Sequence, residues 1–332
     1  MTYWIRTHAA TSGVLLLLLT GLLLISTVGC SSETEADDRL RVVATTNVVG
    51  DLVREIGGDE VALTTLMGPG IDPHQYNASE GDIQRMAQAD WVLYNGLHLE
   101  GRMTDLFPEM SQRGVATTAL AEAAIPDSLL IPSAEFASSY DPHVWFDVAL
   151  WRKAALHVGE RLADLDPEHA ATYQQRAAEY AERLDELDTY ARDQIAQIPE
   201  ERRVLITSHD AFRYMGRAYD LDVRGLQGIS TATEAGTADV QALAQFVADR
   251  RIPTLFAETS VSERGLRAVQ EAVRARGFAV DISDALYGDA LGDADTPTGS
   301  YEGAVRHNVE TIVSGLSERA ESVVGSEPMA IR

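Results

Sequence analysis

Short apolar runs alternate with amphipathic stretches in the first part of the chain. The apolar, β-branched runs predict strands at residues 41–47, 61–67 and 89–95, and the patterns between them predict helices at 48–56 and 78–88. The first helix pattern stops at a pair of glycines, and the second has acidic residues in its first turn, as helix ends prefer. Strands that alternate with helices in this way indicate βαβ units and a mainly parallel sheet.

A long amphipathic segment occupies residues 166–199. Its apolar positions recur at alternating spacings of four and three, with charges between them: Tyr173, Ala177, Tyr180, Leu184, Leu187 and Ala191. Asp166 before Pro167 predicts the start of a helix, and Pro199 ends the pattern. A helix of roughly 30 residues is ~45 Å long, which is too long for one small domain. We interpret it as a rigid connector between two domains, with a coiled-coil interface to a partner as the alternative.

Strand and helix patterns alternate again after the connector. The expected strands are 203–207, 221–226, 254–258 and 279–282, and the expected helices are 237–250, 262–276 and 301–320. No sequence period typical of a solenoid stands out. The predicted fold class is α/β, with mainly parallel sheets in an N-terminal lobe at 41–165 and a C-terminal lobe at 200–332, joined by the long rigid helix.

The N-terminal segment has the pattern of an export signal. Arg6 precedes an apolar stretch at 14–25, and about a dozen apolar residues are too few to cross a bilayer of ~30 Å. Cys30, the only cysteine of the chain, stands at the end of this segment. We expect a lipoprotein signal peptide at 1–29, lipid attachment at Cys30 and a polar tether at 30–40. The alternative is an ordinary cleavable signal with an incidental cysteine.

The chain is strongly acidic. It has 51 acidic and 27 basic residues, a net charge of −24, and Lys153 is its only lysine. This charge argues against binding to nucleic acid or to a membrane through basic residues. It suggests a protein that works in concentrated salt, because a Debye length of ~3 Å at 1 M salt screens self-repulsion. A generally acidic proteome is the alternative explanation.

Three histidines stand at turns or strand ends, each beside an aspartate. His74 and His143 each follow an Asp-Pro pair, which favours a rigid extended turn, and His209 ends the predicted strand 203–207. The aspartates could orient the imidazoles. The sequence shows no serine or cysteine nucleophile motif near them, so a metal site is favoured over acid–base catalysis. His98 follows a predicted strand and could lie beside the same metal site. We expect His157, His169 and His307 to lie outside any site.

A fourth ligand would complete a tetrahedral site or, as a bidentate carboxylate, a larger shell. The candidates are acids near later strand ends: Glu258, Asp284, Asp289 and Asp293. Spacing alone does not choose among them.

Several motifs resemble those of the zinc/manganese solute-binding lipoproteins of ABC transporters, the cluster A-I family. The matching segments are residues 72–76, 95–101, 141–147, 208–212, 225–230 and 287–293, and the resemblance extends from about residue 41 to 316. It implies two α/β lobes that hold one divalent ion, Zn²⁺ or Mn²⁺, in the cleft between them. By position, the family's four ligands match His74, His143, His209 and Asp289.

The resemblance also implies a function and a location. The protein would be exported to the periplasm or the cell surface, anchored by lipid at Cys30, and would deliver metal to an ABC-transporter permease with its ATPase. Manganese-selective members often carry glutamate at the position of His209, which favours zinc or mixed specificity. The histidine-rich loop common in dedicated zinc importers is missing between residues 97 and 141, which argues against a dedicated zinc importer. The sequence therefore does not decide between zinc and manganese.

Two other functions compete with metal capture. A zinc hydrolase would use three histidines and a water, but a closed set of three histidines and one aspartate leaves no open position, and the chain has no His-Glu-x-x-His motif. We therefore expect a binding protein and not an enzyme. A surface adhesion lipoprotein would need no ordered ligand set, and replacement of His143 would leave its activity intact.

The charge generates one prediction about stability. If the acidic surface is adapted to salt, the melting temperature should rise between low and molar salt, because counterions screen the repulsion between carboxylates. Calorimetry over a series of salt concentrations measures this. An unchanged melting temperature would favour the explanation by an acidic proteome.

Overall fold

The computed structural model describes residues 38–133 and 140–317, and the chain from Arg39 onward forms one compact unit. The predicted signal peptide, Cys30 and nearly all of the tether lie outside the described residues. No helix within the described part of the chain is both long enough and apolar enough to cross a membrane.

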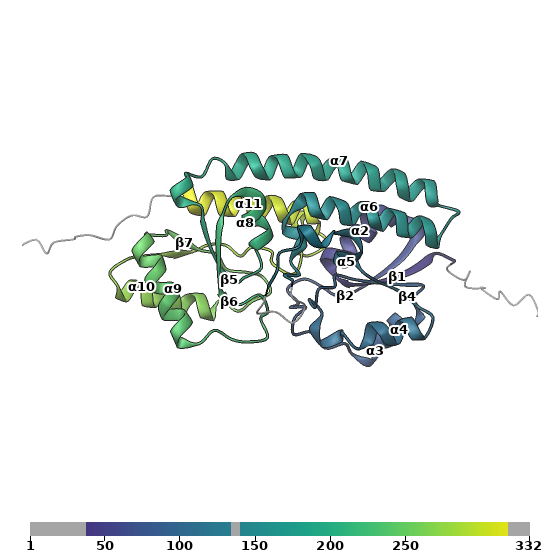
Figure 1. Ribbon diagram of the computed structural model, residues 1–332, viewed down its shortest axis with the longest axis horizontal. Coiled ribbons are helices and arrows are strands. Elements are labelled where there is room, and N and C mark those ends of the chain that lie inside the picture. The colour runs from purple at the N-terminus through teal and green to yellow at the C-terminus, as the bar shows by residue number, and fades with distance from the viewer. Residues whose placement is uncertain (1–37, 134–139, 318–332) are drawn as a thin grey trace, which may run out of the picture. The chain divides into compact units, whose positions relative to one another are not determined.

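The N-terminal lobe is built on a parallel sheet of four strands in the order β2-β1-β3-β4. These strands are β1 (Leu40–Thr46), β2 (Val61–Met67), β3 (Trp91–Tyr94) and β4 (Ala116–Ala119). Helices α3 (Glu80–Gln88) and α4 (Leu106–Gln112) cover one face, and α2 (Asn47–Gly57) and α5 (Leu120–Ala124) pack into the core on the other (Figure 1). All strands therefore end at the same edge, where the loops that follow them meet.

The C-terminal lobe repeats this arrangement with a different sequence. Its strands are β5 (Val204–His209), β6 (Asp222–Gln227), β7 (Thr254–Leu255) and β8 (Asp281–Ile282). β5 pairs with β6, β7 pairs with β8, and a parallel bridge between Thr207 and Phe256 connects the two pairs. The resulting order β6-β5-β7-β8 corresponds to that of the first sheet.

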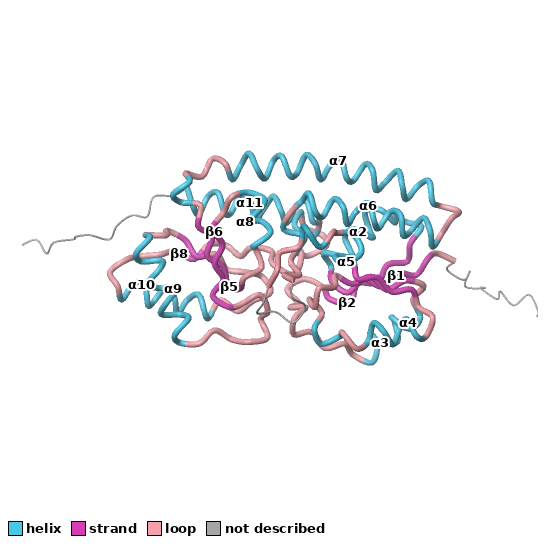
Figure 2. Tube along the Cα trace, viewed as in Figure 1, coloured by secondary structure: helices cyan, strands magenta, loops and turns pink. Residues whose placement is uncertain are grey.

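Helices cover both faces of the second sheet as well (Figure 2). Helices α9 (Thr237–Arg250) and α10 (Arg264–Ala275) pack on one face, and their buried side chains form a cluster of their own. Helices α8 (Arg213–Tyr219) and α11 (Tyr301–Ser317) contribute to the same apolar cluster as α2 and α5. One apolar core thus runs through both lobes.

The long helix α7 (Ala170–Ile195) lies over this shared core and contacts α2, α8 and α11 (Figure 1). Its buried residues include all six positions of the predicted stripe, and its 26 residues span about 39 Å. The predicted α/β fold class with parallel sheets and one long helix is confirmed.

The helices differ from the predictions in several places. Helices α4, α5, α6 (Val148–Leu165) and α8 were not predicted, and Asp166 is the C-cap of α6 and not the N-cap of α7. The Asp166 carboxylate accepts hydrogen bonds from His169 Nδ1 at 2.7 Å and from the Tyr173 hydroxyl at 2.7 Å. These bonds fix the turn between α6 and α7.

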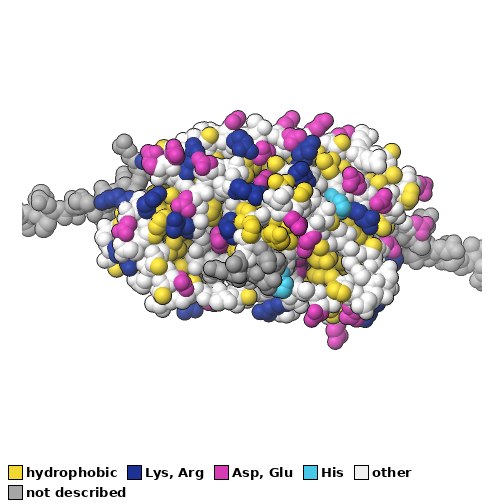
Figure 3. Space-filling view, viewed as in Figure 1, with side chains coloured by type: hydrophobic (Ala, Val, Ile, Leu, Met, Phe, Trp, Pro, Cys, Tyr) yellow, Lys and Arg dark blue, Asp and Glu magenta, His cyan; other side chains and the backbone are white. Residues whose placement is uncertain are grey.

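Charged side chains of both signs are mixed over the face of the molecule seen in Figure 3. Arg183, for example, lies between Glu55 and Glu302, so a basic residue of α7 contacts acids from both lobes. Each partly exposed ion pair of this kind contributes little to the stability of the fold, because dissolved salt screens the two charges.

Helix α6 packs closely on α7 at Gly159. A substitution at Gly159 therefore tests the packing of the apolar core that both lobes share. A Cβ atom at Gly159 would lie 2.4 Å from the Ala177 Cβ, so Gly159→Ala should lower the free energy of unfolding by about 1–3 kcal/mol. Gly81→Ala is the matched control, because its Cβ would meet nothing closer than 3.6 Å and alanine favours a helix by up to about 1 kcal/mol. Urea denaturation measures the free energy of unfolding of both variants. Equal stabilities of the two variants would contradict the close packing.

Candidate metal centre

His74 lies in the loop between β2 and α3, held by the aspartate that precedes it by two residues. The His74 backbone N–H donates to Asp72 Oδ1 at 2.9 Å, which closes the turn that Pro73 rigidifies. The residue is buried, with 4% of its surface exposed. The turn therefore directs the imidazole inward and away from solvent.

His143 directly precedes a short 3₁₀ turn at Val144–Phe146 and is held twice by Asp141. Its backbone N–H donates to Asp141 Oδ1 at 3.0 Å, and its Nδ1 lies 2.8 Å from the same oxygen. Because the carboxylate accepts a hydrogen bond from Nδ1–H, the lone pair of the neutral ring is on Nε2. The prediction that a neighbouring aspartate orients the imidazole is confirmed for His143.

His209 is the last residue of β5, and Glu258 from the end of another strand supports it. The His209 backbone N–H donates to Glu258 Oε1 at 2.9 Å, and Nδ1 lies 2.7 Å from Oε2. The prediction that the adjacent Asp210 would orient this ring is therefore wrong. Glu258, one of the four acids considered as the remaining ligand, lies behind His209 and outside the cluster of facing groups.

Gly225 on β6 allows the backbone around His209 to take this position. A Cβ atom at Gly225 would lie 2.3 Å from the Asp210 backbone nitrogen and 2.5 Å from the His209 carbonyl carbon. Any larger residue at this position would push His209 away from the neighbouring strand. The segment 225–230, identified only by resemblance, thus contributes to the site through its backbone.

Asp289 follows β8 in a loop that residues of the N-terminal lobe hold in place. The Trp145 indole donates to the Gly288 carbonyl at 3.2 Å, and the Asn47 side chain both accepts from Leu291 N–H at 2.9 Å and donates to the Leu291 carbonyl at 3.1 Å. The Asp289 carboxylate is buried, and neither of its oxygens accepts a hydrogen bond from the described residues. The other two candidate acids, Asp284 and Asp293, are exposed and lie outside the cluster.

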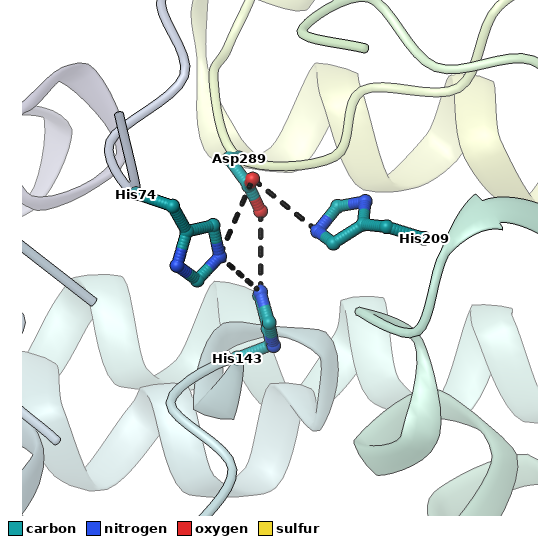
Figure 4. Close-up of side chains that lie close together, drawn as sticks. All are labelled: His74, His143, His209 and Asp289. Carbon is teal, nitrogen blue, oxygen red and sulfur yellow. Dashed lines mark hydrogen bonds and ion pairs between the residues drawn. The ribbon is translucent and has the colours of Figure 1, made fainter. Parts of the chain in front are cut away.

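The four side chains face one another at the junction of the two lobes (Figure 4). His74 Nε2 lies 3.3 Å from His143 Nε2, and Asp289 oxygens lie 3.5 Å from His143 Nε2, 3.3 Å from His209 Nε2 and 3.9 Å from His74 Nε2. Ligand atoms at 2.0–2.1 Å from a tetrahedral ion are about 3.3–3.4 Å apart. Four of the separations are at or above this spacing, and the ligand atoms as a set lie within 4.8 Å of one another, so the cluster is somewhat wider than a tetrahedral shell. The second oxygen of Asp289 could supply a fifth donor.

The protonation of these groups follows from their burial and their mutual charges. Burial lowers the pKa of His74 to about 3. Burial also opposes protonation of His209, but the carboxylates of Glu258 and Asp289 outweigh it and raise the pKa well above its ordinary value. Burial disfavours the ionised form of Asp289, yet the facing His209 and then His143 hold the pKa of this carboxyl well below its ordinary value. In protein stripped of metal we therefore expect His209 to be protonated and to balance the charge of Asp289.

The remaining described histidines do not join the cluster. His98, considered as a possible ligand, lies in a left-handed turn near Thr104, with 3.5 Å between its Nδ1 and the Thr104 hydroxyl. His169 contacts Asp166, and His307 Nε2 lies 3.1 Å from the Ala285 carbonyl. His157 is partly buried on α6. Sequence reasoning missed Glu258 as the support of His209, because that contact depends on the order of strands in the sheet.

Two parallel α/β lobes with three imidazoles and one carboxylate at their junction define the class of metal-binding substrate-binding proteins. A family model described as "zinc-uptake complex component A periplasmic" matches residues 42–315. The chain belongs to this family. Its members are solute-binding proteins and not enzymes, and they work with the permease and ATPase of an ABC transporter.

Relatives of this chain include proteins named for different metals. The manganese-binding lipoprotein MntA of Bacillus subtilis is 44% identical over 291 residues, which cover 87% of this chain and 94% of that protein. The zinc-binding protein TroA of Treponema pallidum is 45% identical over 289 residues, covering 86% of this chain and 92% of TroA. A solved structure of periplasmic zinc-binding TroA superposes with a TM-score of 0.81 at 44% identity, covering 84% of this chain and 99% of TroA.

The electrostatics of the cluster generate a prediction about its histidines. In protein stripped of metal, His209 should stay an imidazolium at pH 7 while His74 stays neutral at pH 5, because carboxylates face His209 and burial dominates at His74. Nitrogen-15 NMR of the imidazoles measures both protonation states. Glu258→Gln should lower the pKa of His209, and a neutral His209 at pH 7 in the unmutated protein would contradict the assignment.

Proposed function

We propose that this protein is an extracytoplasmic substrate-binding protein that captures one divalent transition-metal ion and delivers it to an ABC-transporter permease for import. His74, His143, His209 and Asp289 are its ligands. The first two come from the N-terminal lobe and the other two from the C-terminal lobe, so the bound ion joins the lobes.

One observation carries this proposal: a fully buried carboxylate without hydrogen bonds faces three imidazole nitrogens. A buried charge is costly unless it is paired or binds a metal. A divalent ion at the centre would compensate Asp289 and accept the lone pairs of all three rings. Binding then requires His209 to release its proton, so affinity falls on acidification.

The donor set fits zinc or manganese as the transported ion. Neutral imidazoles suit zinc, and a carboxylate with two free oxygens also suits metals that take more ligands, such as manganese. The relatives named for manganese and for zinc support the same pair of metals. For a given set of ligands zinc binds more tightly than manganese in the usual order of divalent ions, so zinc should win in direct competition.

The organisation of the chain suits this function. Residues 1–29 are the signal peptide, Cys30 carries the lipid that anchors the protein to the membrane, and residues 30–40 are the tether. Lobes at 41–165 and 200–332, with the connecting segment 166–199 that contains α7, then form the binding unit. The relatives named as lipoproteins support the anchor. The partners are the permease and its ATPase, and no nucleic acid is involved.

The protein is not a hydrolase. Catalytic zinc keeps an open position for water, whereas this set supplies at least four protein donors from buried side chains. A closed shell suits capture and release of the ion itself.

Metal analysis of the purified protein tests the proposal. We expect one tightly held zinc or manganese per chain, and His143→Ala should bind at least tenfold more weakly, because one of four ligands is lost. His169→Ala is the matched control, since its imidazole is 41% exposed on the surface near the start of α7. Mass spectrometry of the metals and a zinc titration measure stoichiometry and affinity, and circular dichroism verifies that both variants fold.

Either of two results would contradict the proposed function. If the unmutated protein binds neither zinc nor manganese, the four residues do not act as ligands. If His143→Ala binds zinc as tightly as His169→Ala, the ion is held elsewhere.

A further inference from the structure

The four proposed ligands are closed off from solvent. The side chains of His143, His209 and Asp289 are 0% exposed and that of His74 is 1% exposed. An ion can therefore enter or leave only if contacts between the lobes open. The contacts between the lobes that surround the cluster differ in strength, and this difference indicates where exchange takes place.

The contacts on the side of α7 and α11 are extensive and buried. Asp51 of α2 accepts from the Tyr301 N–H at 2.9 Å, and the Tyr301 hydroxyl donates to the Trp145 carbonyl at 2.6 Å. The two hydrogen bonds between Asn47 and Leu291 lie nearby. The apolar core shared by both lobes continues through this region. Opening here would break the core of the protein.

A second set of contacts, near His143, also combines apolar and polar groups. The rings of Phe146 and Phe212 are 4.2 Å apart, and the Tyr214 hydroxyl donates to the Asp141 carbonyl at 3.0 Å. Arg217 donates to the Leu129 carbonyl at 2.7 Å and to Asp147 at 3.2 Å. These contacts bury aromatic surface, so opening on this side is also costly.

The third set, near His74, consists of hydrogen bonds around one aspartate. Thr231 of the C-terminal lobe donates its hydroxyl proton to Asp72 Oδ2 at 2.6 Å, and Gln75 donates to the same oxygen at 2.8 Å. The Gln75 amide reaches the Thr231 carbonyl only at 3.4 Å. Among the described residues, no member of 71–75 or 230–234 belongs to a buried apolar cluster. Opening this contact would break a few hydrogen bonds and no apolar core.

A polar groove leads to this third contact. It has a volume of about 870 Å³, and Asp72, Gln75 and Thr231 line it together with Ser208, Gln227 and Ser260. The buried oxygens Oγ of Ser208 and Ser260 and Oε1 of Gln227 have no hydrogen-bond partner among the described residues. Such oxygens can replace water around a divalent ion. None of the four proposed ligands lines the groove, but Asp72 and Gln75 do, and both lie in the loop that carries His74. The groove therefore approaches the cluster through this loop.

We propose that metal ions exchange through this groove and that the Thr231–Asp72 hydrogen bond is the latch that closes it. Asp72 accepts from Thr231 with one oxygen and from the His74 backbone with the other. Breaking the latch therefore frees the loop that holds His74, which becomes the first ligand to leave. Thr231 and Asp72 act as positioning residues that set the rate of metal release. This inference rests on the proposed function.

The rate of zinc release tests the latch. Zinc-loaded protein is mixed with an excess of a chromogenic chelator in a stopped-flow instrument. Thr231→Val keeps the shape of the side chain but removes its hydroxyl, so we expect release to be about tenfold faster, the effect of losing one hydrogen bond to a charged group. Thr231→Ser keeps the hydroxyl and should restore the rate of the unmutated protein. Zinc stoichiometry should stay at one per chain in both variants.

Two control variants distinguish loss of the Thr231–Asp72 hydrogen bond from a general loosening of the contacts between the lobes. Ser230→Ala changes the same loop without touching Asp72, and Arg217→Ala removes the cross-lobe hydrogen bonds near His143. Both should release zinc within about twofold of the unmutated rate. An unchanged rate for Thr231→Val, or an equal acceleration by Arg217→Ala, would overturn the proposed route while leaving the proposed function intact. Absence of zinc binding by the unmutated protein would instead remove the proposed function, and the latch with it.

Discussion

The structure depends on the burial of the Asp289 carboxylate among three imidazoles. An ionised carboxylate in a dry interior is unstable alone, and here neither of its oxygens receives a hydrogen bond from the described residues. The facing histidines compensate it: a protonated His209 balances the charge, while His74 is kept neutral by its own burial. A divalent ion would satisfy all four groups at once. A proton or a cation at the centre of the cluster would offset the cost of burying this carboxylate, which is the physical basis of the proposed metal binding and of its expected dependence on pH.

Support for the imidazoles comes from a further layer of carboxylates. Asp141 binds the Nδ1 side of His143, and Glu258 lies against Nδ1 of His209, so both rings present Nε2 to the centre. Parallel sheets make this possible, because the ends of neighbouring strands lie side by side and their loops meet at one edge. Both lobes use the same strand order, and each brings such an edge to the cluster. The fold thus supplies ligands and their supports from residues far apart in the chain.

The two lobes are joined unequally around the cluster. A continuous apolar core, α7 and several buried hydrogen bonds connect them on one side, whereas hydrogen bonds around Asp72 connect them beside the groove. A protein that must hold an ion tightly and still release it needs this inequality. The strong side preserves the arrangement of the lobes, and the weak side allows a local opening at low cost. On the proposed route, affinity and release rate would be set by different residues.

Elements with strong periodicity and residues with distinctive local chemistry could be predicted from the order of amino acids. The strands around residues 41–67, the helix 237–250 and the apolar stripe of α7 were predicted because alternation and spacing are local properties of the chain. The Asp-Pro-His turns marked His74 and His143 for the same reason. Helices α4, α5, α6 and α8 and strand β4 were missed, and Asp166 was assigned to the wrong helix end.

Which groups face one another depends on how the two lobes fold and pack together. Glu258, Asp284, Asp289 and Asp293 are equivalent by spacing, and resemblance alone favoured Asp289. The order of strands places Glu258 behind His209, while Trp145 and Asn47 from the other lobe hold the loop of Asp289 toward the cluster. The hydrogen bond between Asp72 and Thr231 joins residues 159 positions apart. Such pairs have no local signature, because their distances are set by the packing of whole lobes and not by the conformation of either segment.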